Sequence, residues 1–239
     1  MKQLLLVLGL LTASVSQTSF AADPPAAAAG ASGTSTAAVT PDPAGTAPPA
    51  VKPATPPPAE AAPAVVAKPI LSGPVYVQVT TNQGNFTIEL FSERAPLTVI
   101  QFLKNVDAGF YSGTIFHRVI PNFIIQAGGF DASGKIKTVN TRVHNESGNG
   151  LTNQRGTVGM ARSSEPHSGD SQFYVNLFDN GALDPNPNRW GYAVFGKIRT
   201  GMDVVDKIGN VATGAKAPFK EDAPLQPVII EKIERIASP

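Results

Sequence analysis

The distribution of aromatic residues separates this chain into a part that can fold and a part that cannot. No Phe, Tyr or Trp lies between Phe20 and Tyr76, and Ala and Pro dominate residues 23–74. Such a stretch cannot bury enough apolar surface to offset the entropy of ordering it. We therefore predict a disordered Ala/Pro-rich linker over residues 23–74 and one folded domain over residues 75–239. The prolines favour extended polyproline II geometry, so a ligand for a proline-reading module is the alternative interpretation of the linker.

Residues 1–22 have the layout of a secretory signal peptide. Lys2 precedes an apolar run over residues 4–11, and Ala21 and Ala22 suit a cleavage site. The apolar run is too short to span a bilayer comfortably, but no charged residue lies between Gln3 and Ala22. An uncleaved anchor is therefore the alternative, and it would be the chain's only contact with a membrane. The sequence has no cysteine, which excludes disulfides and lipid attachment through a thiol.

The basic residues and the histidines of the predicted domain argue against nucleic acid and metal ions as partners. Residues 75–239 hold 16 Lys and Arg against 15 Asp and Glu, a formal charge of +1, and the basic residues are scattered. Binding to nucleic acid by electrostatics needs a basic stripe or patch, so we predict no nucleic-acid partner. His117, His144 and His167 lack the spacing of metal ligands, so we predict no metal site.

The predicted domain begins with a strong hairpin pattern. Apolar and polar residues alternate over residues 75–80 and again over residues 86–90, on either side of the turn-forming Asn82-Gln83-Gly84. Period-two alternation around a short turn with glycine predicts a β-hairpin. Pro96 then suits the first turn of a helix, and Gly109 suits its end. The helical spacing on one face is kept by Val99, Phe102, Leu103, Val106 and Phe110.

The rest of the domain is a series of short segments separated by glycine or asparagine turns. We predict strands over residues 115–120, 123–127, 157–160, 173–176, 193–197 and 228–236, and a second helix over residues 202–208. Many short strands with two helices favour a closed barrel or a sandwich, because an open sheet would leave edges that need protection. The pattern alone leaves the choice between these two open.

Three sequence blocks favour the barrel over the sandwich. They are FHRVIPNFIIQAGGF over residues 116–130, GTVGMAR and SQFYVN over residues 156–162 and 171–176, and GYAVFGK over residues 191–197. In this order the blocks resemble the signature of the cyclophilin family of peptidyl-prolyl isomerases, and the last block resembles its bacterial periplasmic branch.

The resemblance covers essentially all of residues 75–239 and carries expectations for fold and function. It implies a mainly β domain, a closed eight-stranded antiparallel β-barrel capped by two α-helices. It implies an enzyme that accelerates rotation about Xaa-Pro bonds in unfolded or flexible exported proteins. With the leader, it implies a periplasmic protein. We expect a monomer whose partners are polypeptides containing Xaa-Pro bonds and which needs no cofactor.

The chemistry of this reaction explains why an arginine is the central residue. Partial double-bond character gives the Xaa-Pro bond a barrier of about 18 to 20 kcal/mol. When the amide twists, the proline nitrogen regains its lone pair, so a donor aimed at that nitrogen binds the twisted state better than either planar state. The guanidinium group of arginine is always protonated and is itself rigid, which suits this role.

The resemblance also assigns roles to individual residues. It implies that Arg118 is the catalytic donor and that Gln126 positions it. The residues implied to bind substrate are Phe123, Ile124, Tyr174 and Leu183 in the proline pocket, Gln172 beside the substrate backbone, and Ala161, Arg162 and Tyr192 at the rim.

The chain departs from the family pattern at a few of these positions. Ala182 stands where many eukaryotic members have a tryptophan, and the only tryptophan is Trp190. Ile124, Arg162, Tyr174 and Tyr192 also differ from the common eukaryotic residues. These changes keep the pocket apolar, so we expect isomerase activity to persist and cyclosporin affinity to be low.

The sequence is also compatible with a binding module, and it contains a residue order found in proteases. A prolyl-peptide binding module or holdase with incidental activity would use the same apolar pocket, but the presence of both Arg118 and Gln126 favours the enzyme. Gly169-Asp170-Ser171, with His117 and Asp131 upstream, repeats the residue order of chymotrypsin-like proteases. Those enzymes have two glycines after the serine, where this chain has Gln and Phe, so we reject a protease.

Overall fold

The computed structural model describes residues 73–239 of the chain. The predicted signal peptide over residues 1–22 lies outside the described residues, as does the predicted linker over residues 23–74 except for its last two positions. No helix formed by residues 73–239 is both long and apolar enough to cross a membrane.

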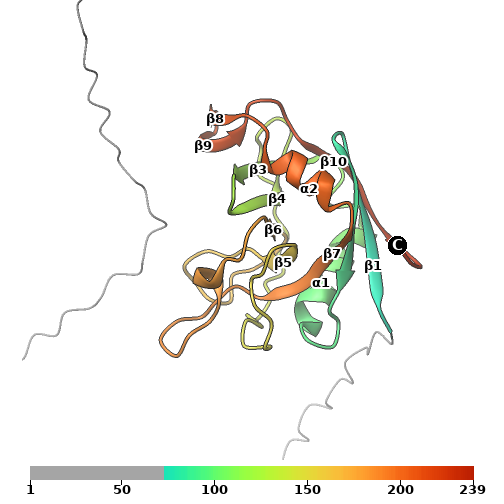
Figure 1. Ribbon diagram of the computed structural model, residues 1–239, viewed down its shortest axis with the longest axis vertical. Helices are drawn as coiled ribbons and strands as arrows, with labels where there is room; N and C mark the ends of the chain where they lie inside the picture. Colours follow the sequence, from blue (N-terminus) through green and yellow to red (C-terminus); the bar gives the residue numbers. More distant parts are fainter. Residues whose placement is uncertain (1–72) are drawn as a thin grey trace, which may run out of the picture. The chain divides into compact units, whose positions relative to one another are not determined.

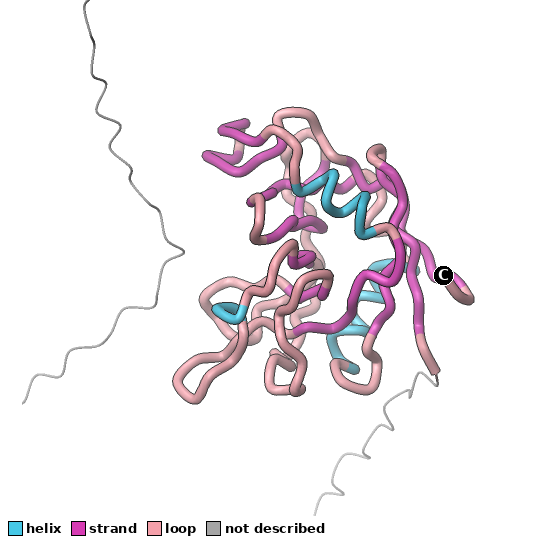
Figure 2. Tube along the Cα trace, in the orientation of Figure 1, coloured by secondary structure: helices cyan, strands magenta, loops and turns pink. Residues whose placement is uncertain are grey.

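Eight antiparallel strands close into a barrel in the order β1-β10-β3-β4-β6-β5-β7-β2 (Figure 1). This confirms the predicted fold class. Long loops connect the strands between β4 and β7, as the pink segments of Figure 2 show. The barrel strands are β1 (Val75–Thr81), β2 (Gly84–Leu90), β3 (Thr114–Ile120), β4 (Ile124–Asp131), β5 (Thr157–Met160), β6 (Phe173–Asn176), β7 (Val194–Thr200) and β10 (Ile229–Ile236).

The first two strands form the predicted hairpin. The pairing runs without a break from Val75 opposite Leu90 to Thr81 opposite Gly84. Val77 and Val79 are fully buried in the barrel interior, because alternation places every second side chain on the same face. Here the local pattern predicted both the strands and the face that each residue takes.

Two helices bury their apolar faces against the barrel core. The helices are α1 (Pro96–Asp107) and α2 (Met202–Gly209), and a short 3-10 helix, η1, spans Gly181–Leu183. Val99 and Phe102 of α1 and Val205 and Ile208 of α2 belong to the same buried cluster as the inward residues of the strands. Side chains from the strands and from both helices therefore fill the interior of the barrel. A site for substrate has to lie on the outer surface of the barrel or in its loops.

The amino-terminal end of α1 is capped by a residue far away in the sequence. Ala95, which precedes the helix, offers no side-chain cap. Instead the Glu146 carboxylate accepts hydrogen bonds from the backbone N–H groups of Leu97 and Thr98, at 3.1 and 2.8 Å, and from the Thr98 hydroxyl at 2.7 Å. A carboxylate here satisfies otherwise unpaired donors and complements the helix dipole.

The sequence pattern missed a second, smaller sheet. Strands β8 (Thr213–Lys216) and β9 (Phe219–Pro224) form a two-stranded hairpin that packs along β3. Neither segment shows apolar alternation, and Gly214 in β8 and Pro224 in β9 are residues that strands disfavour. This hairpin exists because it packs against the barrel, and it brings a charged residue to the site described next.

Candidate active site

A β-bulge in β3 turns Arg118 out of the barrel. Phe116 lies opposite Ala127 of β4, but Arg118 lies opposite the adjacent residue, Gln126, so β3 has one extra residue at His117. Phe116 and Val119 both point into the core and are fully buried. Strict alternation from Phe116 would have pointed Arg118 inward as well, whereas the bulge leaves its side chain 42% exposed.

The register of the barrel then places four residues in one row across its outer face. Arg118 is opposite Gln126, Gln126 is opposite Tyr174, and Tyr174 is opposite Gly159, so the row crosses β3, β4, β6 and β5. Directly opposed side chains lie about 5 Å apart at Cβ, so Arg118 and Tyr174 are separated by about 10 Å. The structure thus brings the predicted donor and a predicted pocket residue to the two sides of Gln126.

Gln126 is held by Gln172 and not by Arg118. Its Nε2 donates a hydrogen bond of 3.0 Å to Oε1 of Gln172, which projects on the same face. The Gln172 side chain packs directly on Gly129 of β4, where an added Cβ would lie 2.5 Å from its Cδ. The two predicted glutamines therefore form one fixed pair in the middle of the site.

Tyr174 is locked in place at the end of the row. Its ring lies on Gly159, where an added Cβ would be 2.2 Å from Tyr174 Cζ, and its hydroxyl donates to Asn153 Oδ1 at 2.6 Å. Tyr174 is 2% and Asn153 1% exposed. Burial raises the pKa of the Tyr174 phenol well above its ordinary value, and the nearby Tyr192 and Asp184 add to the effect. The hydroxyl is therefore a neutral donor.

Arg162 and Tyr192, which we predict at the rim of the site, lie against each other. The Arg162 guanidinium donates to the backbone carbonyls of Gly191 at 3.1 Å, Trp190 at 2.8 Å and Ser163 at 2.9 Å. It also lies 4.4 Å from the centroid of the Tyr192 ring. That ring meets Tyr174 edge to face, with centroids 6.0 Å apart. Arg162, which follows β5, thus holds the loop before β7 in place beside Tyr174.

The remaining predicted residues differ in how far the structure connects them to the row. Ile124 is buried and lies two residues before Gln126 on the same face of β4. Phe123 and Leu183 are half-buried and come from the turn before β4 and from η1. The Ala161 N–H donates to the Gln172 carbonyl at 2.9 Å, which continues the β5–β6 pairing beyond Met160.

Three residues of the site were not found from the sequence. Asn153 anchors Tyr174, and Gly159 leaves room for its ring. Asp222, on β9, places its Oδ2 atom 3.5 Å from Arg118 Nε. Gly159 lies in one of the sequence blocks that carry the family resemblance, and its place in that block was the one signal in the sequence that pointed to it. Asn153 and Asp222 come from loops and from the hairpin that the pattern missed.

Comparison with known proteins identifies the family. Residues 76–235 match the model of the cyclophilin type peptidyl-prolyl cis-trans isomerase family. The chain is a member of this family. It is 47% identical over 161 residues to peptidyl-prolyl cis-trans isomerase A of Dickeya dadantii (strain 3937), which covers 67% of this chain and 84% of that protein. It is 49% identical over 158 residues to the peptidyl-prolyl cis-trans isomerase of Acinetobacter baylyi, which covers 66% and 84%.

Solved structures agree with this cyclophilin assignment. A crystal structure of a Cryptosporidium parvum cyclophilin type isomerase matches with a TM-score of 0.58 and 26% identity, covering 70% of this chain and all of that one. A second structure of it, in the presence of the dipeptide Ala-Pro, matches with a TM-score of 0.56 and 27% identity, covering 68% and 99%. This cyclophilin is thus a peptidyl-prolyl cis-trans isomerase, similar to bacterial enzymes, and the binding-module alternative gains no support.

His117, the bulge residue of this cyclophilin, is a buried neutral side chain. It is 7% exposed, and its ring packs on Phe130 and Phe219 with centroids 4.7 and 5.8 Å away. Burial lowers its pKa to about 4, and the positive charge of Arg118 contributes to the lowering. His117 therefore has a structural role, because it packs between the barrel and the β8–β9 hairpin.

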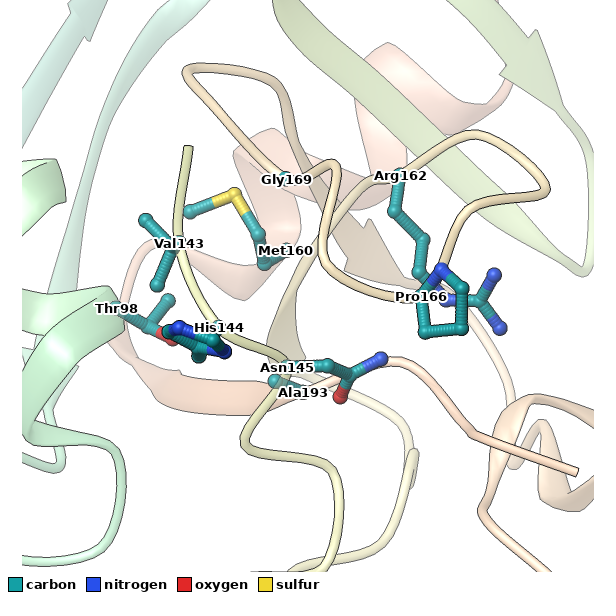
Figure 3. Close-up of a pocket in the computed structure, with 9 residues that line it drawn as sticks. All are labelled: Thr98, Val143, His144, Asn145, Met160, Arg162, Pro166, Gly169 and Ala193. Atoms are coloured by element: carbon teal, nitrogen blue, oxygen red, sulfur yellow. The ribbon is translucent and has the colours of Figure 1, made fainter. Parts of the chain in front are cut away.

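A small hollow lies beside the rim. Figure 3 shows Arg162 and Pro166 at one end and Val143 and Met160 at the other. Of the predicted site residues, Arg162 alone lines it, so the hollow is separate from the row of Arg118. His144 also borders it and packs on His167, with centroids 5.0 Å apart. Within residues 73–239 no group of three or more His, Asp or Glu side chains is placed to hold a metal ion.

Proposed function

We propose that Arg118 and the row of side chains beside it catalyse rotation about Xaa-Pro bonds in flexible segments of exported proteins. Arg118 donates to the proline nitrogen, and Phe123, Ile124, Tyr174 and Leu183 receive the proline ring. The Gln126–Gln172 pair, with Ala161 and Arg162, holds the chain that precedes the proline. Tyr192 closes the rim.

The observation that carries this proposal is the row itself. One exposed cation and one locked, buried aromatic ring lie on the same outer face, about 10 Å apart. Proline inserted beside Tyr174 would place its imide nitrogen between them, within reach of an arginine side chain. No proton has to be transferred, which agrees with a site whose buried histidine and tyrosine are both neutral.

The arginine accelerates the reaction by binding the twisted amide more tightly than the planar one. A hydrogen bond from a charged donor contributes about 1.5 to 3 kcal/mol, and about 1.4 kcal/mol is tenfold in rate. Arg118 therefore supplies roughly ten- to a hundredfold. The rest comes from holding the flanking chain while one side rotates, and from the apolar surroundings of Ile124 and Tyr174, which favour the less polar twisted amide.

The test is exchange NMR on a short peptide containing an Ala-Pro bond, the dipeptide named with the Cryptosporidium structure. We expect Arg118→Ala to lower the catalysed exchange rate at saturating peptide by ten- to a hundredfold. Arg118→Lys keeps the charge but loses the planar, rigid guanidinium, so its exchange rate should lie between those of wild type and Arg118→Ala. Arg199→Ala is the matched control, because Arg199 is an exposed arginine on strand β7.

Two results would count against the assignment. If Arg118→Ala kept the wild-type exchange rate, the arginine would not be the donor. If the rate fell equally in Arg118→Ala and Arg199→Ala, the loss would reflect general surface charge and not the site.

We also propose that the enzyme works in the periplasm as a monomer on exported, unfolded clients. Residues 1–22 support export, through Lys2, the apolar run over residues 4–11 and the small residues at Ala21 and Ala22. The eight strands of the closed barrel leave no edge among themselves for pairing with a second copy, which supports the monomer. The mass of the protein recovered from the periplasmic and the membrane fractions tests export. A mass that retains the first 22 residues would favour the uncleaved anchor.

A further inference from the structure

The β8–β9 hairpin is fixed to the barrel next to the bulge that carries Arg118. Phe219 at the start of β9 packs on His117 and on Phe130 of β4, with ring centroids 5.8 and 4.9 Å apart. Figure 1 shows the hairpin beside β3, at the upper side of the barrel. At its other end, Ala223 and Pro224 are buried. The part of β9 between these anchors therefore has a defined position relative to Arg118.

Asp222 lies between these anchors in an unusual backbone conformation. Its φ is +56°, in the left-handed region that few residues other than glycine, asparagine and aspartate adopt. A side chain leaves the backbone there in a direction that an extended residue would not take. This conformation turns the carboxylate toward Arg118, and the Oδ2 to Nε distance is 3.5 Å.

Arg118 has no other fixed partner among residues 73–239. Gln126, the residue expected to position it, donates to Gln172 instead. Asp222 is its single ion-pair partner in the described part of the chain, and no described residue forms a hydrogen bond with Arg118 Nη1 or Nη2. The contact therefore engages one side of the guanidinium and leaves the two Nη groups available for a substrate.

We propose that Asp222 is a positioning residue that holds the guanidinium of Arg118 in the orientation needed for the twisted amide. This rests on the proposed role of Arg118. The pair is partly exposed, with side chains 42% and 31% accessible, so its contribution to folding is small. The ion pair instead affects the rate of the reaction. A flexible arginine that is already oriented loses less rotamer freedom when the transition state forms, so the contact raises kcat more than substrate affinity.

The test compares Asp222→Asn with Glu221→Gln in the full chain, by exchange NMR on the Ala-Pro peptide. Asparagine accepts the positive φ and removes only the charge, while Glu221 is the adjacent exposed carboxylate and has no ion pair in residues 73–239. We expect Asp222→Asn to lower kcat three- to tenfold with less than a twofold change in KM. Glu221→Gln should stay within 1.5-fold of wild type. Should Asp222→Asn not fold, Asp222→Gly replaces it, because glycine also accepts this φ.

A double-mutant cycle separates this proposal from that of Arg118. In the Arg118→Ala background, Asp222→Asn should cause no further loss of kcat, because its effect acts through the arginine. An equal loss in that background would overturn the proposal, as would a wild-type or raised kcat in Asp222→Asn or an increase in KM alone. If instead Arg118→Ala is itself fully active, the proposed function of Arg118 fails, whatever Asp222 does.

Discussion

The contact between Gly159 and Tyr174 allows a sharp prediction for a single methyl group. The backbone at Gly159 is not in the left-handed region, so alanine could adopt it, and the glycine is required only by the ring that lies on it. An added Cβ would be 2.2 Å from Tyr174 Cζ, so an ordinary contact of 3.4 Å needs the ring to retreat by roughly 1.2 Å. The hydrogen bond of 2.6 Å to Asn153 cannot survive that movement.

The magnitude follows from three contributions. Overpacking a buried site costs about 1 to 3 kcal/mol. Leaving a buried polar group without its partner costs about 1 to 3 kcal/mol. Replacing glycine returns about 0.4 to 1 kcal/mol through the unfolded chain. We therefore expect Gly159→Ala to lower the free energy of unfolding by about 3 kcal/mol, and to lower isomerase activity because Tyr174 leaves its place.

Urea unfolding followed by circular dichroism, with a double-mutant cycle, measures this effect. Tyr174→Ala removes the ring, so Gly159→Ala in that background should be neutral or stabilising by up to about 1 kcal/mol. Tyr174→Phe keeps the ring and loses only the hydroxyl, and it should cost about 1 kcal/mol. If Gly159→Ala destabilised the Tyr174→Ala protein as much as wild type, the clash with the ring would not be the reason for the glycine.

Two further predictions concern His117 and Glu146. The folded pKa of His117, about 4, lies below the ordinary value of 6.5, so the unfolded chain takes up the proton first as the pH falls. The free energy of unfolding should therefore fall as the pH is lowered from 6.5 to 4, and this residue should contribute roughly 3 kcal/mol to the fall. Urea titrations at pH 7.5 and 4.5 measure this change, which should be smaller in His117→Phe. An unchanged slope would argue against a buried neutral imidazole. Glu146→Ala should cost about 1 to 2 kcal/mol through loss of the cap on α1, whereas exposed Glu165→Ala should cost less than about 0.5 kcal/mol. Equal effects in the two variants would contradict the capping role.

Much of the site was accessible from the sequence because a family signature carries it. The blocks around Arg118, Gln126, Gln172 and Tyr174 led us to predict these residues, and the register places Arg118, Gln126 and Tyr174 side by side. Their partners were not predictable. The expected link between Gln126 and Arg118 is absent, because Gln126 bonds Gln172 while Arg118 meets Asp222. Side-chain partners depend on packing between strands that no local pattern describes.

Local patterns alone determined the hairpin of β1 and β2, the apolar face of α1 and the approximate positions of the later barrel strands, but not those of β8 and β9. Each of these depends on residues that are near one another in the chain, and alternation or helical spacing reports them directly. Tertiary structure alone decided the outward turn of Arg118, the cap that Glu146 provides for α1, and the approach of Asp222 to the site. The cap joins residues 48 positions apart and the contact of Asp222 joins residues about 100 positions apart, whereas the turn of Arg118 depends on the register between the neighbouring strands β3 and β4. These features exist because closing the barrel sets the register between strands, and because a hairpin without a pattern of its own is stabilised by packing on β3.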